Sequence, residues 1–121
     1  MAGRGNKHSK AKYEELIKNA INSALRRDFT DARLTMCTIT RVELTEEYDY
    51  AKVWWDTFDS GKRGDIKEAI DGIRGKLRSI LAAKIDVRHM PELQFHYDSQ
   101  YEDEMRISQL LKKTNGPDEG N

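Results

Sequence analysis

Gly72 and Gly75 lie three residues apart in the chain, and a basic residue, Arg74, lies between them. A tight loop of this composition can bring its backbone close to a nucleic-acid phosphate, because glycine adds no side chain and tolerates unusual backbone angles. The chemistry that this spacing offers is therefore nucleic-acid binding through the backbone.

The residues around the two glycines instead favour a helix that bends. Ile70, Ile73 and Leu77 have the spacing of one apolar helix face, and a loop of four residues would break that register. Each glycine destabilises a helix by about 1 kcal/mol relative to alanine. Two glycines within one turn thus predict a kink at Gly72 and Gly75. The kinked helix is the favoured interpretation, and the phosphate-binding loop is the alternative.

Residues suited to catalysis or metal binding are few. The three histidines, His8, His89 and His96, have no cysteine or carboxylate at the spacing of metal ligands. Cys37 falls within a predicted strand, where the role of a small buried apolar residue is favoured. The sequence contains no nucleotide- or dinucleotide-binding loop. We therefore expect no catalytic residue, no metal site, no cofactor and no small-molecule substrate.

The composition indicates one cytoplasmic domain with segregated charge. The chain has 121 residues, a single cysteine and a net charge of zero. Residues 1–34, 35–61, 62–91 and 92–121 carry net charges of +4, −4, +4 and −4. Basic segments of this kind favour a polyanionic partner. The lone cysteine favours a reducing compartment, and no apolar stretch has the length of a signal peptide or a membrane span.

Apolar periodicity predicts six elements in an α+β domain. They are a helix over 9–27, strands over 35–44 and 50–58, a helix from 65 to 84, a strand over 93–97 and a short helix over 102–113. Asp65 is the expected N-cap of the second helix, with Glu68 as its capping-box partner. Trp54 and Trp55 are neighbours in a strand, so one should enter the core and the other should face outward. Residues 1–9 are expected to form a flexible basic arm, and 114–121 a disordered tail.

Four short motifs have the order and spacing of one protein family. They are Asp31-Ala32-Arg33-Leu34, Ala51-Lys52-Val53, Pro91-Glu92-Leu93 with Phe95, Tyr97 and Asp98, and Ile107 with Leu110 and Leu111. Over residues 10–113 the chain resembles the ribosome-binding factor A family. Ala32 stands where the family has proline, and the turn over 45–49 departs from the family's Ser-Arg-Asp type. Both departures concern loops, so the implied fold is unchanged.

The resemblance implies a KH-type domain of the second topology, α-β-β-α(kink)α-β, with a three-stranded sheet covered by helices and a short C-terminal helix. The family has Ala-x-Gly at its kink, which corresponds here to Ile73-Arg74-Gly75. The resemblance also implies a binding factor rather than an enzyme. Such a factor binds the small (30S) ribosomal subunit, assists late maturation and processing of 16S rRNA, and is linked to growth in the cold. We expect a monomer that has no membrane partner.

Two other functions remain open on the sequence. A stand-alone KH-type protein would bind single-stranded RNA through Gly72–Gly75. A protein–protein adaptor would use the acidic strands and the last helix.

Basic side chains could form one RNA-facing surface around the central helix. The candidates are Lys10, Lys12, Arg33, Arg74, Lys76, Arg78, Lys84 and Arg88. The alternative is a solvated helix face on which Asp71 pairs with Arg74.

Overall fold

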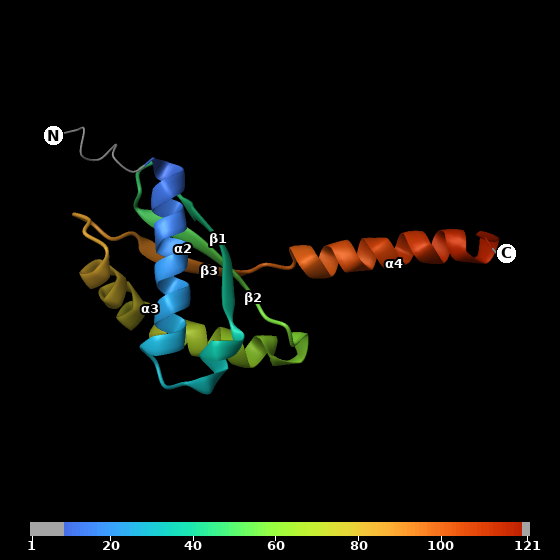
Figure 1. The fold of residues 1–121 in the computed structure, drawn as a ribbon, viewed down its shortest axis with the longest axis horizontal. Helices are drawn as coiled ribbons and strands as arrows, with labels where there is room; N and C mark the ends of the chain where they lie inside the picture. Colours follow the sequence, from blue (N-terminus) through green and yellow to red (C-terminus); the bar gives the residue numbers. More distant parts are fainter. Residues whose placement is uncertain (1–8, 120–121) are drawn as a thin grey trace.

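A computed structural model describes the backbone of residues 9–119 and the side chains of residues 9–100 and 102–112 (Figure 1). Residues 1–8 of the predicted basic arm lie outside the described residues. The elements in chain order are α2 (Lys10–Arg27), η1 (Ala32–Met36), β1 (Thr38–Leu44), β2 (Tyr50–Asp56), η2 (Ser60–Lys62), α3 (Arg63–Lys84), β3 (Glu92–Tyr97) and α4 (Gln100–Glu119). This order of helices and strands is that of the expected KH-type domain.

The three strands form one mixed sheet in the order β1-β2-β3. β1 and β2 are antiparallel neighbours, with Val42 opposite Val53, as their close spacing predicts. β2 and β3 are parallel, with Val53 opposite Phe95. A parallel pair needs a crossover connection, and α3 supplies it.

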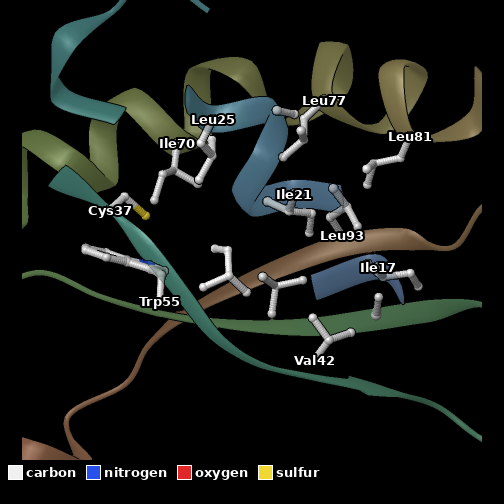
Figure 2. Close-up of a cluster of buried hydrophobic side chains, with 14 of the residues drawn as sticks. Ile17, Ile21, Leu25, Cys37, Val42, Trp55, Ile70, Leu77, Leu81 and Leu93 are labelled. Carbon is white, nitrogen blue, oxygen red and sulfur yellow. The ribbon is translucent and has the colours of Figure 1, made fainter. Parts of the chain in front are cut away.

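The core lies between α2, α3 and one face of the sheet. Figure 2 shows side chains from both helices directed at side chains of the strands. The largest fully buried members from the helices are Ile17, Ile21, Leu25, Ile66, Ile70, Leu77 and Leu81, and Val53 and Leu93 meet them from the strands. Alternation along β2 buries Trp55 and leaves Trp54 on the opposite face of the sheet, as expected of neighbouring strand residues.

The first helix follows its predicted bounds closely. The Ser9 side chain accepts a hydrogen bond from the Lys12 backbone N–H at 3.1 Å and caps the helix. Tyr13, Ile17 and Ile21 are buried on one face. Leu16 was predicted to belong to the same apolar stripe but is 41% exposed, because it lies at the edge of that face.

The first strand begins later than predicted, at Thr38. The Asp31 carboxylate accepts a hydrogen bond from the Arg33 backbone N–H at 3.0 Å and starts the 3₁₀ turn η1, which takes up Thr35 and Met36. Cys37 therefore lies just before the strand rather than within it. Its side chain is buried in the core, as expected of a small apolar residue.

The second predicted helix, α3, begins earlier than predicted. The Asp59 carboxylate accepts a hydrogen bond from Gly61 N–H at 3.0 Å and starts η2, which leads directly into α3 at Arg63. Asp65 is thus in the first turn and is not the N-cap, so the capping box with Glu68 is wrong. The predicted end at Lys84 is confirmed.

The last helix leaves the domain. In Figure 1, α4 projects away from the sheet and from α2 and α3. Its backbone continues to Glu119, past the predicted end at Lys113, so it includes most of the stretch predicted to be a disordered tail.

Candidate nucleic-acid interface

The two glycines lie inside a continuous helix. α3 runs without interruption from Arg63 to Lys84, and no glycine of the described residues has a positive φ. The Gly-x-x-Gly segment is therefore not a loop. This excludes the alternative interpretation of a loop that binds a phosphate through its backbone. In Figure 1 the axis of the last turns of α3 differs in direction from that of its first turns. That the kink lies at Gly72 and Gly75 stays a prediction.

The glycines are not required by packing within the chain. Both are exposed, and a Cβ atom added to Gly72 or Gly75 would meet nothing within 4 Å. Two exposed glycines weaken the helix without any gain in internal packing. They also leave part of its outer surface bare of side chains.

Arg33 is engaged within the fold. Its Nη2 lies 2.7 Å from Asp31 Oδ2, and its Nη1 lies 3.4 Å from Glu68 Oε1. Nη1 also donates to the Asp65 carbonyl at 3.3 Å. The Arg33 guanidinium, hydrogen-bonded to Asp31, lowers the pKa of that carboxyl below its usual value. Arg33 thus ties η1 to the first turns of α3.

Arg78 joins α3 to the segment that leads into β3. Its Nη2 donates to the Met90 carbonyl at 2.6 Å, and its Nε donates to the Pro91 carbonyl at 3.1 Å. Its Nη1 lies 3.6 Å from a carboxylate oxygen of Glu92. A guanidinium presents donors in a fixed fork, which suits two successive carbonyls. The primary role of Arg78 in this geometry is to position β3.

Lys84 is engaged in the same way at the end of α3. Its Nζ lies 3.1 Å from Asp28 Oδ2 in the segment that follows α2. This contact links the ends of the two helices. Three of the eight predicted RNA contacts, Arg33, Arg78 and Lys84, are therefore also structural ties.

The other five candidates are exposed. Among the described residues, the side chains of Lys10, Lys12, Arg74 and Arg88 have no hydrogen bond or ion pair. The alternative pair of Asp71 with Arg74 does not form; the Asp71 carboxylate instead lies 2.8 Å from Lys67 Nζ.

Lys76 covers an aromatic ring. Its Nζ lies 5.8 Å from the ring centroid of Phe29, in the segment after α2. Arg26 and Arg27, in the last turn of α2, precede that segment and are exposed. The sequence reasoning missed these two residues, although basic residues are typical of a helix C-terminus. The end of α2 and the middle of α3 thus present adjoining cations.

The candidates fall into two basic regions along α2. Figure 1 shows α2 meeting α3 near the C-terminal end of α2, so the start of α2, with Lys10 and Lys12, lies at the other end of that helix from Lys76. One region is the start of α2, and the other joins the end of α2 to α3. A single RNA-facing surface that includes both regions stays a prediction.

Other chemistry has little support. Burial raises the pKa of the Cys37 thiol to about 12, so a thiolate nucleophile is disfavoured there. Within the described residues, no three His, Cys, Asp or Glu side chains are grouped so that they could hold a metal ion. None of the helices in that part of the chain has the length and apolar character of a membrane span.

Comparisons with known proteins agree with the motifs and the fold. The family model described as "Ribosome-binding factor A" matches residues 9–111. Ribosome-binding factor A of Nitrosomonas eutropha is 35% identical over 101 residues, which cover 83% of this chain and 86% of that protein. The crystal structure of ribosome-binding factor A from Thermus thermophilus has a TM-score of 0.66 at 24% identity and covers 74% of this chain and 94% of that one.

A second structural match extends the comparison. It is a homology model of the Thermus thermophilus ribosome binding factor A, fitted into the cryo-EM map of a 30S–RbfA complex. It has a TM-score of 0.60 at 24% identity and covers 75% of this chain and 97% of that chain. The family model spans α2, the whole sheet, α3 and most of α4. The chain belongs to the ribosome-binding factor A family.

Proposed function

We propose that this protein binds the small (30S) ribosomal subunit and assists late maturation and processing of its 16S rRNA. The observation that carries this proposal is the family match over residues 9–111, which takes in the whole KH-type domain. A relative of the same fold has been fitted into the map of a 30S complex. In this proposal the protein is a cytoplasmic monomer, and cells depend on it most for growth in the cold.

The five candidates that form no ion pair within the fold are the proposed direct contacts to RNA. Lysine and arginine side chains without an internal ion pair can neutralise phosphates without first breaking one. These are Lys10, Lys12, Arg74, Lys76 and Arg88. In this proposal Arg33, Arg78 and Lys84 act mainly by positioning the helices that present them. Phosphate contacts carry no base information, so the shape of the folded rRNA sets the specificity.

The exposed glycines support a close approach to RNA. Because Gly72 and Gly75 have no side chains and a Cβ atom placed on either would meet nothing within 4 Å, a phosphate backbone can lie nearer to α3 there than elsewhere on the helix. The contacts would then come from Arg74 and Lys76 beside the bare surface, rather than from a backbone loop.

Co-sedimentation with purified ribosomal particles tests this function. In magnesium-containing buffer, the protein should sediment with 30S subunits in preference to mature 70S ribosomes. Equal association with both particles, or none, would overturn the proposal. The double variant R74E/K76E should lose most of this binding, whereas K62E/K67E, which changes the net charge equally at η2 and the start of α3, is the matched control and should keep it.

The maturation role has a separate test in cells. Depletion of the protein should cause precursor 16S rRNA to accumulate, and the defect should be stronger in the cold. Expression of the natural chain should restore processing, and R74E/K76E should not. Normal processing in depleted cells would leave subunit binding standing and remove the maturation role.

A further inference from the structure

The sheet has an outer face, the side opposite α2 and α3. Alternation along the strands puts Arg41, Tyr50, Lys52, Trp54 and His96 on this face. Four of the five side chains are exposed, and Trp54 is partly buried. In Figure 1, α4 projects away from the sheet, so neither α2, α3 nor α4 covers the outer face. Exposed aromatic side chains near one another are typical of an interaction site.

Three planar groups form a row across the outer face. The guanidinium carbon of Arg41 lies 3.9 Å from the ring centroid of Trp54, and the ring centroids of Trp54 and His96 are 5.4 Å apart. The strand register places Arg41 and His96 on opposite sides of Trp54. β3 is the last strand, so the side of His96 away from Trp54 has no neighbouring strand. One more planar group can extend the row there, and Arg41 shows that a guanidinium stacks well in it.

Each exposed ring of the outer face has a carboxylate near it. Tyr50 is 44% exposed and lies opposite Glu92 across the β2–β3 pair. Asp98 follows His96 by two residues and continues the pairing with β2, because its N–H donates to the Trp55 carbonyl at 2.7 Å. A ring beside a carboxylate suits a guanidinium or an ammonium group, which can stack on the first and pair with the second.

The charge of the outer face also favours a basic partner. Its charged side chains are four carboxylates and two cations, namely Glu43, Asp56, Glu92 and Asp98, with Arg41 and Lys52. Arg41 Nη1 lies 3.7 Å from Glu43, and Arg78 Nη1 reaches Glu92 from α3 at 3.6 Å. With Arg78 counted, the carboxylates still outnumber the cations. The outer face therefore attracts lysine and arginine rather than phosphate.

We propose that the outer face docks an extended, arginine-containing segment of a small-subunit protein. One arginine stacks on His96 near Asp98, and a second basic side chain lies on Tyr50 beside Glu92. Tyr50 and Trp54, the neighbour of His96, are four residues apart on β2, which is about 13 Å in an extended chain. The two basic residues of the segment are therefore also about four positions apart. Lys52 lies between the two sites and disfavours a third cation there.

This inference rests on the proposed function. It assigns different partners to the two sides of the domain, with rRNA on the basic regions of α2 and α3 and protein on the outer face of the sheet.

Photo-crosslinking on purified 30S subunits tests the assignment. A photo-reactive phenylalanine analogue in place of Tyr50 or Gln94 should crosslink to a ribosomal protein, and mass spectrometry should find basic residues in the crosslinked peptide. The same analogue in place of Arg74 should crosslink to 16S rRNA. Three results from positions 50 and 94 would overturn the inference while the protein still sediments with 30S subunits: crosslinks to rRNA, crosslinks to a peptide without basic residues or to a second copy of this chain, or no crosslink. A failure of the natural chain to sediment would instead overturn the proposed function, and this inference with it.

Removal of the rings supplies an independent measurement. Y50A/H96A should weaken binding to 30S subunits about tenfold, the combined factor for two exposed cation–π contacts. F58A is the control, because Phe58 is an aromatic residue that is 94% exposed but lies in the loop after β2. It should leave the affinity unchanged. Equal affinities for Y50A/H96A and F58A would overturn the docking role.

Removal of a carboxylate separates a basic partner from RNA. E92Q should weaken binding about twofold, the scale of one exposed ion pair, whereas it should strengthen binding if phosphates lay on the outer face. Arg78 keeps its bonds to the Met90 and Pro91 carbonyls in E92Q, so the fold is retained. E104Q removes the same charge on α4 and should leave the affinity unchanged. Stronger or unchanged binding of E92Q would overturn the assignment of a basic segment.

Discussion

α3 and α4 are helices of similar length, 22 and 20 residues, that are held in different ways. α3 packs Ile66, Ile70, Leu77 and Leu81 into the core, and its two glycines are exposed to water. α4 presents apolar side chains to water and has acidic residues in its first turn. α3 therefore tolerates poor local helix propensity because the core holds it. α4 has the length of a helix but lacks the packing that would hold it in the free protein.

The largest difference should appear when apolar side chains of the two helices are shortened. L77A removes a fully buried side chain and should lower the free energy of unfolding by about 2–5 kcal/mol. I107A shortens a side chain that is half exposed and should change the free energy of unfolding by less than about 0.5 kcal/mol. Urea unfolding followed by circular dichroism measures both. Similar losses for the two variants would mean that α4 packs on the domain in solution.

A smaller effect should separate two arginines of α3. R78M leaves the Met90 and Pro91 carbonyls without their donor and should cost about 1–2 kcal/mol of stability, since the group is partly exposed. R74M removes no internal contact and should change stability by less than about 0.5 kcal/mol.

Binding to 30S subunits should rank the same two variants in the opposite order. R74M should lower the slope of log binding constant against log salt concentration by about one, the value for one phosphate contact. Folded R78M should bind 30S subunits nearly as well as the natural chain. A loss of binding confined to R78M would contradict the division between structural and RNA-contacting arginines.

The division between residues engaged within the fold and residues free to contact RNA also shows what the sequence could reveal. Periodicity predicted α2, the sheet strands and the register of Ile70, Ile73 and Leu77 through the glycines, because burial on one face repeats along the chain. It could not reveal that Lys84 binds Asp28, because 56 residues separate the two. Side-chain partners that are distant in sequence depend on the assembled fold, so the sequence could not show which candidate residues are engaged within the fold.

The wrong boundaries have a local cause. The start of α3 and the start of β1 were displaced by the 3₁₀ turns η2 and η1. In each turn an aspartate, Asp59 or Asp31, accepts a hydrogen bond from a backbone N–H two residues later. Aspartate favours such turns generally, but composition alone does not tell an Asx turn from a helix cap.

The exposed glycine of α3 should separate stability from binding. G75A should raise the free energy of unfolding by about 0.5–1 kcal/mol, because alanine favours the helix and its Cβ meets no neighbour. The same methyl group should weaken binding to 30S subunits if RNA approaches the bare surface. S79A, an exposed position one turn further along α3, is the control and should leave binding unchanged. A stabilised G75A with unchanged affinity would remove the glycines from the proposed interface.

The smallest effect concerns the Asp31–Arg33 ion pair at the start of η1. Arg33 lowers the pKa of Asp31 in the folded protein, so the pair contributes stability above the unfolded pKa of about 4. That contribution is lost as the pH falls through the depressed folded pKa. The difference in Tm between the natural chain and D31N should thus be largest at neutral pH and shrink in acid. R33M should also show a difference that shrinks in acid, because it breaks the same pair, and it should lose in addition the contacts of Arg33 with Glu68 and the Asp65 carbonyl. A Tm difference that is constant from neutral to acidic pH would show that Asp31 acts only as the acceptor that starts η1.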